Sequence, residues 1–157
     1  MVIDTGDAKE GFISTVKTPV EAPSIGSNKK VIMPGDVIIS RLRPYLRQVA
    51  FVDQGIAFEE NTIIVCSNEF YVIRSINGSS IAYLVPLLLS DEVQEILEAS
   101  QEGGHHPRFN QNVLENLIIP SELLASKNEV SRRVEKAASL VREGRNIITD
   151  LSIAFRH

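Results

Sequence analysis

Apolar positions near the C-terminus recur with the period of one helix face. They are spaced alternately by four and three residues, which is the pattern of a coiled-coil seam. The seam comprises Val130, Val134, Ala137, Val141, Gly144, Ile148, Leu151 and Phe155, and Leu140 and Ile147 widen it. We predict a long amphipathic helix from about Ser126 to about Ala154, roughly 40 Å long at about 1.5 Å per residue.

This stripe predicts a partner. The interface is expected at Val130, Val134, Ala137, Val141, Ile148 and Leu151. The sequence S-K-N-E, from Ser126 to Glu129, predicts a capping box at the start of the helix, in which the two side chains satisfy free backbone N–H groups. Two arrangements remain open: the helix pairs antiparallel with another helix, or it folds back on its own domain.

The front half of the chain predicts β-structure. K-V-I-M-P-G-D-V-I-I-S has the form strand, turn, strand, because Val and Ile favour strands whereas Pro and Gly favour turns. Further strands are expected at 48–52, 61–66 and 70–73, and residues 1–28 are expected to form turns with one or two short strands.

Helical segments follow at 81–89 and 91–99, with Ser90 as N-cap of the second. Pro86 is expected to kink or divide the first. Residues 101–112 are expected to form a loop, and N-V-L-E-N-L-I-I-P suggests a short helix or turn that leads into a strand ending at Pro120. These elements give an α+β fold, with a domain over residues 1–125 and a helical extension over 126–157.

Composition narrows the functional classes. The chain has a single cysteine, Cys66, in an apolar run, which predicts a buried thiol and suits a reducing cytoplasm. The N-terminus does not resemble a signal peptide, and the longest apolar run, 82–89, is too short to span a bilayer, so we expect a soluble cytoplasmic protein without membrane contact.

Charge is unevenly distributed. The net charge of −4 disfavours non-specific nucleic-acid binding. Residues 51–70, however, hold four acids and no Lys or Arg. Residues 29–50 instead concentrate positive charge against Asp36 alone, in Lys29, Lys30, Arg41, Arg43 and Arg47.

The segment S-R-L-R-P-Y-L-R, residues 40–47, offers donors suited to DNA recognition. The guanidinium groups of Arg41, Arg43 and Arg47 can bind phosphates or the O6 and N7 atoms of guanine, and Ser40 and Tyr45 add hydroxyl donors. The alternative interpretation is a solvated strand edge at which arginine discourages aggregation.

A second candidate loop is G-G-H-H-P-R-F-N-Q-N, residues 103–112. Glycines permit close approach to a ligand, and His105, His106, Arg108 and Asn110 can read base edges. A metal site is disfavoured, because adjacent histidines rarely point the same way and no matching Cys or carboxylate spacing accompanies them. An ordinary polar loop remains the alternative.

Catalytic motifs are weak. No G-x-S-x-G elbow surrounds a serine, Asp7-Ala8-Lys9 lacks the preceding aspartate of a nuclease, and Glu59-Glu60 reads as solvent-facing charge. No phosphate-cradling glycine motif or N-P-P-Y signature occurs. We therefore expect no catalytic residue, metal or cofactor.

The order of these signals resembles a known family. P-G-D-V-I-I-S-R-L-R-P-Y-L-R is followed by I-A-Y-L-V-P-L-L-L-S, G-G-H-H-P-R-F, V-L-E-N-L-I-I-P and the long helix. From about Val31 to Ile153 this resembles the specificity (S) subunit of type I restriction-modification systems. The matches are Gly35 to Ser40, Tyr83 with Leu84, and Ile119 with Pro120.

The resemblance implies a non-catalytic target recognition domain that binds double-stranded DNA. Its fold would be a strongly twisted mixed β-sheet with a few helices, followed by a coiled-coil-type spacer helix. Its partners would be the DNA methyltransferase (M) subunit and, through it, the restriction subunit.

A full S subunit contains two recognition domains and two helices, whereas this chain holds one of each. The chain could therefore be a fragment, a half-size subunit that forms a homodimer through the C-terminal helix, or a recognition domain from a fused DNA methyltransferase. A protein interaction module acting through the helix is the competing class, and a small hydrolase or nuclease is the enzymatic one.

Overall fold

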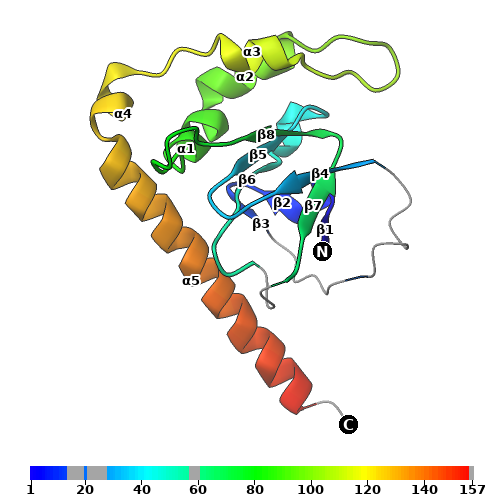
Figure 1. The fold of residues 1–157 in the computed structure, drawn as a ribbon. Coiled ribbons are helices and arrows are strands. Elements are labelled where there is room, and N and C mark those ends of the chain that lie inside the picture. The colour runs from blue at the N-terminus through cyan, green and yellow to red at the C-terminus, as the bar shows by residue number, and fades with distance from the viewer. Residues whose placement is uncertain (14–19, 21–27, 57–60, 156–157) are drawn as a thin grey trace.

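The computed structural model describes residues 1–13, 20, 28–56 and 61–155 (Figure 1). Apart from Val20, the segment 17–27 lies outside the described residues, as does the pair Glu59-Glu60. Within these residues the fold is α+β, as the sequence predicts, with short strands in the front half and helices in the rear half. None of the described helices is long and apolar enough to cross a membrane.

Two three-stranded sheets and a small hairpin make up the described β-structure. The first sheet is mixed, with order β1-β7-β4, and the second is antiparallel, with order β6-β5-β8. A short antiparallel pair, β2 with β3, accompanies them. The strands are β1 (Val2–Ile3), β2 (Ala8–Lys9), β3 (Phe12–Ile13), β4 (Lys29–Ile32), β5 (Val37–Ser40), β6 (Val49–Phe51), β7 (Ile64–Ser67) and β8 (Phe70–Ile73).

The strands flanking the Pro-Gly-Asp turn do not pair with each other. β4 joins β7 in one sheet, whereas β5 lies between β6 and β8 in the other. Every residue of β5 is buried, while Val31 of β4 is 57% exposed. A strand covered on both faces belongs at the centre of a sheet, and β4 is an edge strand.

β5 separates two hydrophobic clusters. Successive side chains of a strand point to opposite faces, so Val37 and Ile39 pack into a cluster with α1, α2 and Phe109. Ile38 packs into a second cluster with Ile3, Cys66 and Phe70. Cys66 is fully buried, as predicted, and burial raises the pKa of its thiol to about 11.

The helices are α1 (Leu84–Leu89), α2 (Asp91–Ala99), α3 (Gln111–Glu115), α4 (Ser121–Ala125) and α5 (Lys127–Ala154), with 3-10 turns η1 (Thr5–Asp7) and η3 (Pro44–Leu46). Ser90 caps α2 as predicted, because its hydroxyl accepts the Val93 N–H at 3.4 Å. α1 continues through Pro86, which lies in the first turn, where a backbone N–H has no intrahelical partner to lose. The prediction that Pro86 divides this segment was therefore wrong.

Two further local predictions were wrong. The link 117–120 forms no strand: it connects α3 to α4, and Ile118 is 87% exposed. Ser126 makes no capping box, because its hydroxyl donates to the Glu122 carbonyl at 2.8 Å and so closes α4. The Ser126 N–H, which the Glu129 carboxylate would accept in a capping box, donates instead to the Glu122 carbonyl at 3.2 Å.

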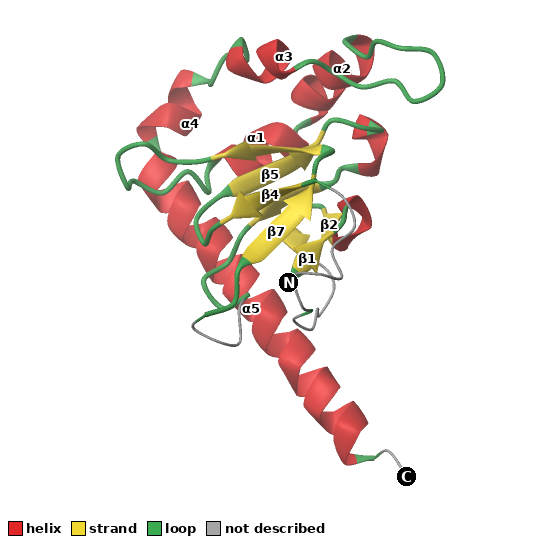
Figure 2. Ribbon diagram, turned by 45° about the vertical axis from the view of Figure 1, so that its right-hand side comes forward, coloured by secondary structure: helices red, strands yellow, loops and turns green. Residues whose placement is uncertain are grey.

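The first half of α5 packs against its own domain. Ser131 and Ala138 are buried, and the Ser131 hydroxyl accepts the Tyr83 N–H at 3.0 Å. Ser80 donates to Glu135 at 2.7 Å, Arg142 pairs with Asp53, and Arg145 donates to the Ile13 carbonyl at 2.8 Å. We call Ser131, Glu135, Ala138, Arg142 and Arg145 the docking stripe. Figures 1 and 2 show that α5 then continues beyond the sheets to the C-terminus.

The packing of α2 on the sheet gives a stability prediction. Leu97 is fully buried, so Leu97→Ala should lower the free energy of unfolding by about 2 to 5 kcal/mol, because it removes contacts and leaves a cavity. Ile96, its neighbour on α2, is 47% exposed, and Ile96→Ala should change it by less than about 1 kcal/mol. Urea unfolding measures both, and equal effects of the two variants would contradict this packing.

Candidate nucleic-acid interface

The two loops singled out in the sequence lie against each other. Leu42 and Arg108 form an antiparallel bridge, and the Phe109 N–H donates to the Arg41 carbonyl at 3.1 Å. Arg108 also bridges to Glu102, which closes the second loop on itself. Backbone hydrogen bonds therefore join segments that are more than 60 residues apart, and the loops form one edge of the domain.

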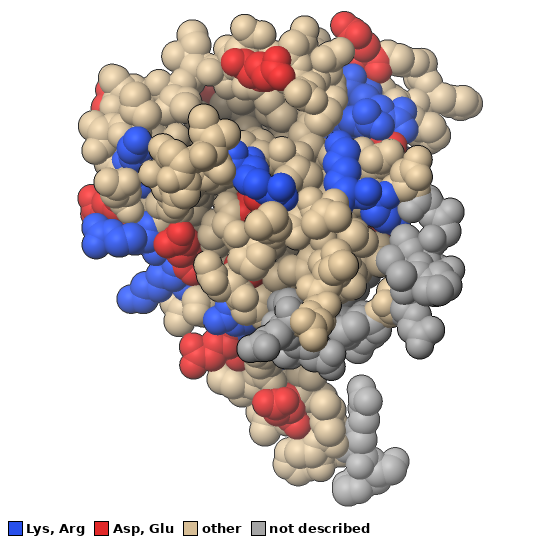
Figure 3. Space-filling view, viewed as in Figure 1, with Lys and Arg blue, Asp and Glu red and all other residues tan. Residues whose placement is uncertain are grey.

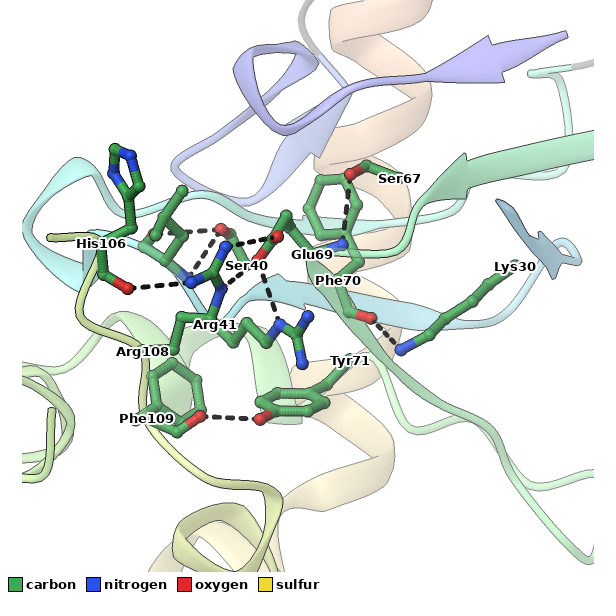
Figure 4. Close-up of polar contacts among 11 residues, drawn as sticks. Lys30, Ser40, Arg41, Ser67, Glu69, Phe70, Tyr71, His106, Arg108 and Phe109 are labelled. Carbon is green, nitrogen blue, oxygen red and sulfur yellow. Dashed lines mark hydrogen bonds and ion pairs between the residues drawn. The ribbon is translucent and has the colours of Figure 1, made fainter. Parts of the chain in front are cut away.

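Glu69 binds an arginine from each loop (Figure 4). It lies in the turn between β7 and β8, where the Ser67 hydroxyl accepts its N–H at 3.2 Å and its own carbonyl accepts the Arg41 N–H at 2.9 Å. Arg108 donates from Nε and Nη2 to the two carboxylate oxygens, at 2.8 and 2.9 Å. Arg41 donates from Nε at 3.0 Å to the oxygen that also accepts Arg108 Nε.

The charges of this cluster do not cancel. Hydrogen bonds from Arg108, and then those from Arg41, lower the pKa of Glu69 to about 2 although partial burial opposes the shift. The same pair raises the pKa of Arg108 above its ordinary value. At neutral pH two guanidinium groups therefore share one carboxylate, and the cluster carries a net positive charge.

Lys30 and Tyr71 extend the edge. The Lys30 ammonium donates to the Phe70 carbonyl at 2.6 Å and lies 5.6 Å from the centre of the Tyr71 ring, within the range of a cation–π contact. The Tyr71 hydroxyl donates to the Phe109 carbonyl at 2.7 Å. In Figure 3 a band of Lys and Arg side chains runs along the side on which Figure 1 draws β4 and the loop after α2.

The rest of the first loop divides into exposed and anchored residues. Arg43 is exposed and Tyr45 is 63% exposed. Arg47 instead donates to the Leu89 carbonyl at 2.6 Å and to Asp91 at 2.9 Å, which ties η3 to the junction of α1 and α2. Ser40 is 2% exposed, and its hydroxyl bonds only to the backbone of Leu42 among the described residues, so it is not presented to a ligand.

The backbone of η3 is constrained at both ends. Arg43 and Arg47 both have φ of 51°, a left-handed conformation that non-glycine residues rarely adopt. Pro44, which is buried, begins the turn between them. Strained residues of this kind persist where the surrounding structure holds them. Here the buried Pro44 and the bound Arg47 hold the turn, and Arg43 and Tyr45 are exposed on it.

The second loop presents its histidines. His105 and His106 are exposed, with stacked rings 5.8 Å apart. Asn110 is exposed, but its side-chain oxygen accepts the Asn112 N–H at 3.1 Å and caps α3, which leaves the amide nitrogen as its outward donor. Among the described residues, no group of three His, Cys, Asp or Glu side chains is placed to hold a metal ion.

The predicted partner interface on α5 splits into two parts. Val130, Val134, Ala137 and Val141 are half-buried, whereas Ile148 and Leu151 are 65% and 51% exposed. Each docking-stripe residue comes one position after a seam residue, so the two stripes lie about 100° apart around the helix. The helix therefore folds back on its own domain with one face and leaves the end of its seam uncovered by the described residues.

Glu69 and Tyr71 could not be identified as members of the site from the sequence, and Lys30 stood out only as part of a positively charged stretch. Glu69 is separated by 28 residues from Arg41 and by 39 from Arg108. Neither separation matches a helix or hairpin period, so no local pattern connects them. The three arginines of the first loop and Arg108 of the second were the available signal, because such charges call for a nearby carboxylate.

Comparison with solved structures finds a similar chain. A structure described as the basis of complex assembly and conformational transition of the type I R-M system contains a chain that matches with a TM-score of 0.64 and 28% identity. The match covers 96% of the present chain and 38% of the other, so this chain spans well under half the length of that neighbour. No protein-family model matches the sequence. No curated protein matches it significantly either.

The Glu69 cluster predicts a pH dependence of stability. Because the pKa of Glu69 is lowered from 4.5 to about 2, its stabilising contribution is complete above about pH 4.5 and is lost as the pH falls through 2. At pH 7 Glu69→Gln should reduce the free energy of unfolding by about 1 to 3 kcal/mol, since the group is partly exposed.

Urea unfolding of both proteins from pH 7 to pH 2 measures this difference, which should shrink toward the acid end. Glu102→Gln serves as the control, because the Glu102 side chain is exposed and makes no ion pair among the described residues. A difference between wild type and Glu69→Gln that stays constant over this range would contradict the ion-pair assignment.

Proposed function

We propose that the chain recognises a specific sequence in duplex DNA as the S subunit, or half-subunit, of a type I restriction-modification system. It has no catalytic role of its own and directs the M subunit and, through it, the restriction subunit. The observation that carries this proposal is the joining of two loops, far apart in sequence, into one basic edge that exposes several hydrogen-bond donors. The similarity to a chain of a type I R-M structure supports it.

Local charge reconciles this role with an acidic protein. The net charge of −4 belongs to the whole chain and does not describe this edge. The edge built from Lys30, Arg41 and Arg108 holds three cations beside one carboxylate. This local excess of positive charge attracts DNA phosphates to the edge.

Roles follow from the chemistry of each exposed group. Arg41 suits a guanine edge, and Arg43 suits phosphate or guanine. His105, His106 and the amide nitrogen of Asn110 suit adenine or water-mediated contacts. Tyr45 offers an aromatic ring with a hydroxyl donor, while Arg47 holds the loop in place through Leu89 and Asp91.

The C-terminal helix supplies the second part of the proposal. Ile148, Leu151 and Phe155 are at least half exposed and lie on one stripe beyond the docking stripe. Apolar stripes of this period bury themselves against another helix. We propose that the seam pairs antiparallel with a second copy, or with the second helix of a longer subunit, and that the pair spaces two recognition domains and binds the M subunit.

Sequence selection tests the DNA-binding proposal. The full chain, incubated with random duplex DNA at about 50 mM salt, should enrich one short sequence, with binding that weakens steeply as salt increases. Arg41→Ala should relax the preference at one base position, worth about 1 to 3 kcal/mol. Arg132→Ala, which removes an exposed arginine from α5, should leave the selected sequence unchanged.

Two outcomes would count against this proposal. A flat salt response with no enriched sequence would favour a protein interaction module that acts through α5. Equal losses on every DNA sequence for Arg41, Arg43, Arg47 and Arg108 variants would show that these arginines bind phosphate without specifying bases.

Sedimentation tests the helix proposal. The double variant Ile148→Asp and Leu151→Asp should convert a self-associated chain to a monomer, because it places charge in the apolar seam. Ile153→Asp is the matched control: Ile153 is 58% exposed and lies about 140° around the helix from Ile148. A wild-type chain that stays monomeric at high concentration would rule out pairing between copies, and loss of association in the control would show that the seam is not the interface.

A further inference from the structure

The two arginines bound to Glu69 are engaged to different extents. Arg108 uses all three kinds of guanidinium nitrogen: Nε and Nη2 donate to Glu69, and Nη1 donates to the His106 carbonyl at 2.9 Å. Arg41 donates to Glu69 from Nε alone. Among the described residues, neither terminal nitrogen of Arg41 has a hydrogen-bond partner, although its side chain is only 33% exposed.

This difference decides what each arginine can offer to a ligand. A guanidinium held through Nε directs the two parallel N–H groups of Nη1 and Nη2 away from its anchor, and this pair matches the O6 and N7 atoms of guanine. Arg108 has three of its five N–H groups in hydrogen bonds, spread over all three nitrogens, whereas Arg41 has one, so Arg108 is less free to make a similar contact. Its contacts connect the second loop to the β7–β8 turn.

The position of Arg41 is further restricted by its backbone. Its N–H donates to the Glu69 carbonyl and its carbonyl accepts the Phe109 N–H, so both peptide groups are bound to the elements that meet at the site. A side chain fixed at its backbone and at Nε has lost most of its rotamers before a ligand arrives. Less conformational entropy is then lost on binding, which favours a specific geometry over general charge attraction.

We propose that Glu69 is a positioning residue for base recognition: it orients Arg41 to read one base pair and binds Arg108 as a structural link between the two loops. This inference rests on the proposed DNA-binding function and assigns specificity within it. Removal of the carboxylate has two opposite effects. The edge becomes more positive, which strengthens attraction to any DNA, whereas Arg41 loses its orientation, which weakens discrimination at one position.

The test is sequence selection and equilibrium binding with random duplex DNA, using full-length wild type, Glu69→Gln, Arg41→Lys and Arg108→Lys. Glu69→Gln and Arg41→Lys should each relax the same single base position by about tenfold. Glu69→Gln should also bind unrelated duplex DNA more tightly than wild type does. Arg108→Lys should weaken binding, because it loosens the link between the two loops, but it should leave the base position read by Arg41 unrelaxed.

Glu102→Gln is the matched control. It removes the same negative charge from the neighbouring loop, so it should raise the affinity for unrelated DNA and leave the selected sequence unchanged. A purely structural role for Glu69 would lower specific and unrelated binding together, which the two readouts distinguish. Arg41→Lys leaves Glu69 in place, so the test holds even if Glu69→Gln folds poorly.

The outcomes separate this inference from the proposed function. If wild type enriches a sequence but Glu69→Gln leaves every base preference intact, or relaxes a position other than that of Arg41, the positioning role is wrong while DNA recognition stands. Relaxation of the Arg41 base position in Arg108→Lys would overturn the division between the two arginines. If wild type enriches no sequence, the DNA-recognition proposal fails, and the inference fails with it.

Discussion

The arrangement of the candidate interface depends on the carboxylate of Glu69. Without it, the guanidinium groups of Arg41 and Arg108 would lie close together as uncompensated like charges, and the second loop would keep only its backbone contacts to the first. The Glu69 carboxylate thus lowers the repulsion between the two arginines enough for both loops to pack at this edge. It neutralises one positive charge and leaves the other for a ligand, because partial neutralisation lowers repulsion without removing the attraction for an anion.

The rest of the fold provides a rigid base for this edge. β5, buried along its whole length, carries the first loop directly from the centre of a sheet, and the two hydrophobic clusters on its faces hold it there. Loops placed on such a strand can differ in side chains without disturbing the core. The docking stripe attaches α5 to the same body through Ser131, Glu135 and Arg142, so the seam projects in a direction set by the domain.

Local patterns predicted local structure well. The long helix, the strand segments, the Ser90 cap and the buried Cys66 all follow from spacing and residue type, and the structure has them. Features that depend on distant partners did not follow. Tertiary contacts decide which sheets β4 and β5 join and how Ser126 is used by α4. They also decide the position of the docking stripe, one residue beyond the seam, and the pairing of Glu69 with both loops. The candidate loops could be named from composition, but not the carboxylate that joins them.

Mapping of a bound duplex onto the chain by NMR tests the central claim most directly, namely that the two loops joined by Glu69 form a DNA-reading edge. Titration of the isotope-labelled chain with duplex DNA should shift the backbone signals of residues 40–47 and 103–112, together with the side-chain signals of Arg41, and leave those of the docking stripe in place. Shifts confined to α5, or spread evenly over all exposed Lys and Arg residues, would contradict the account.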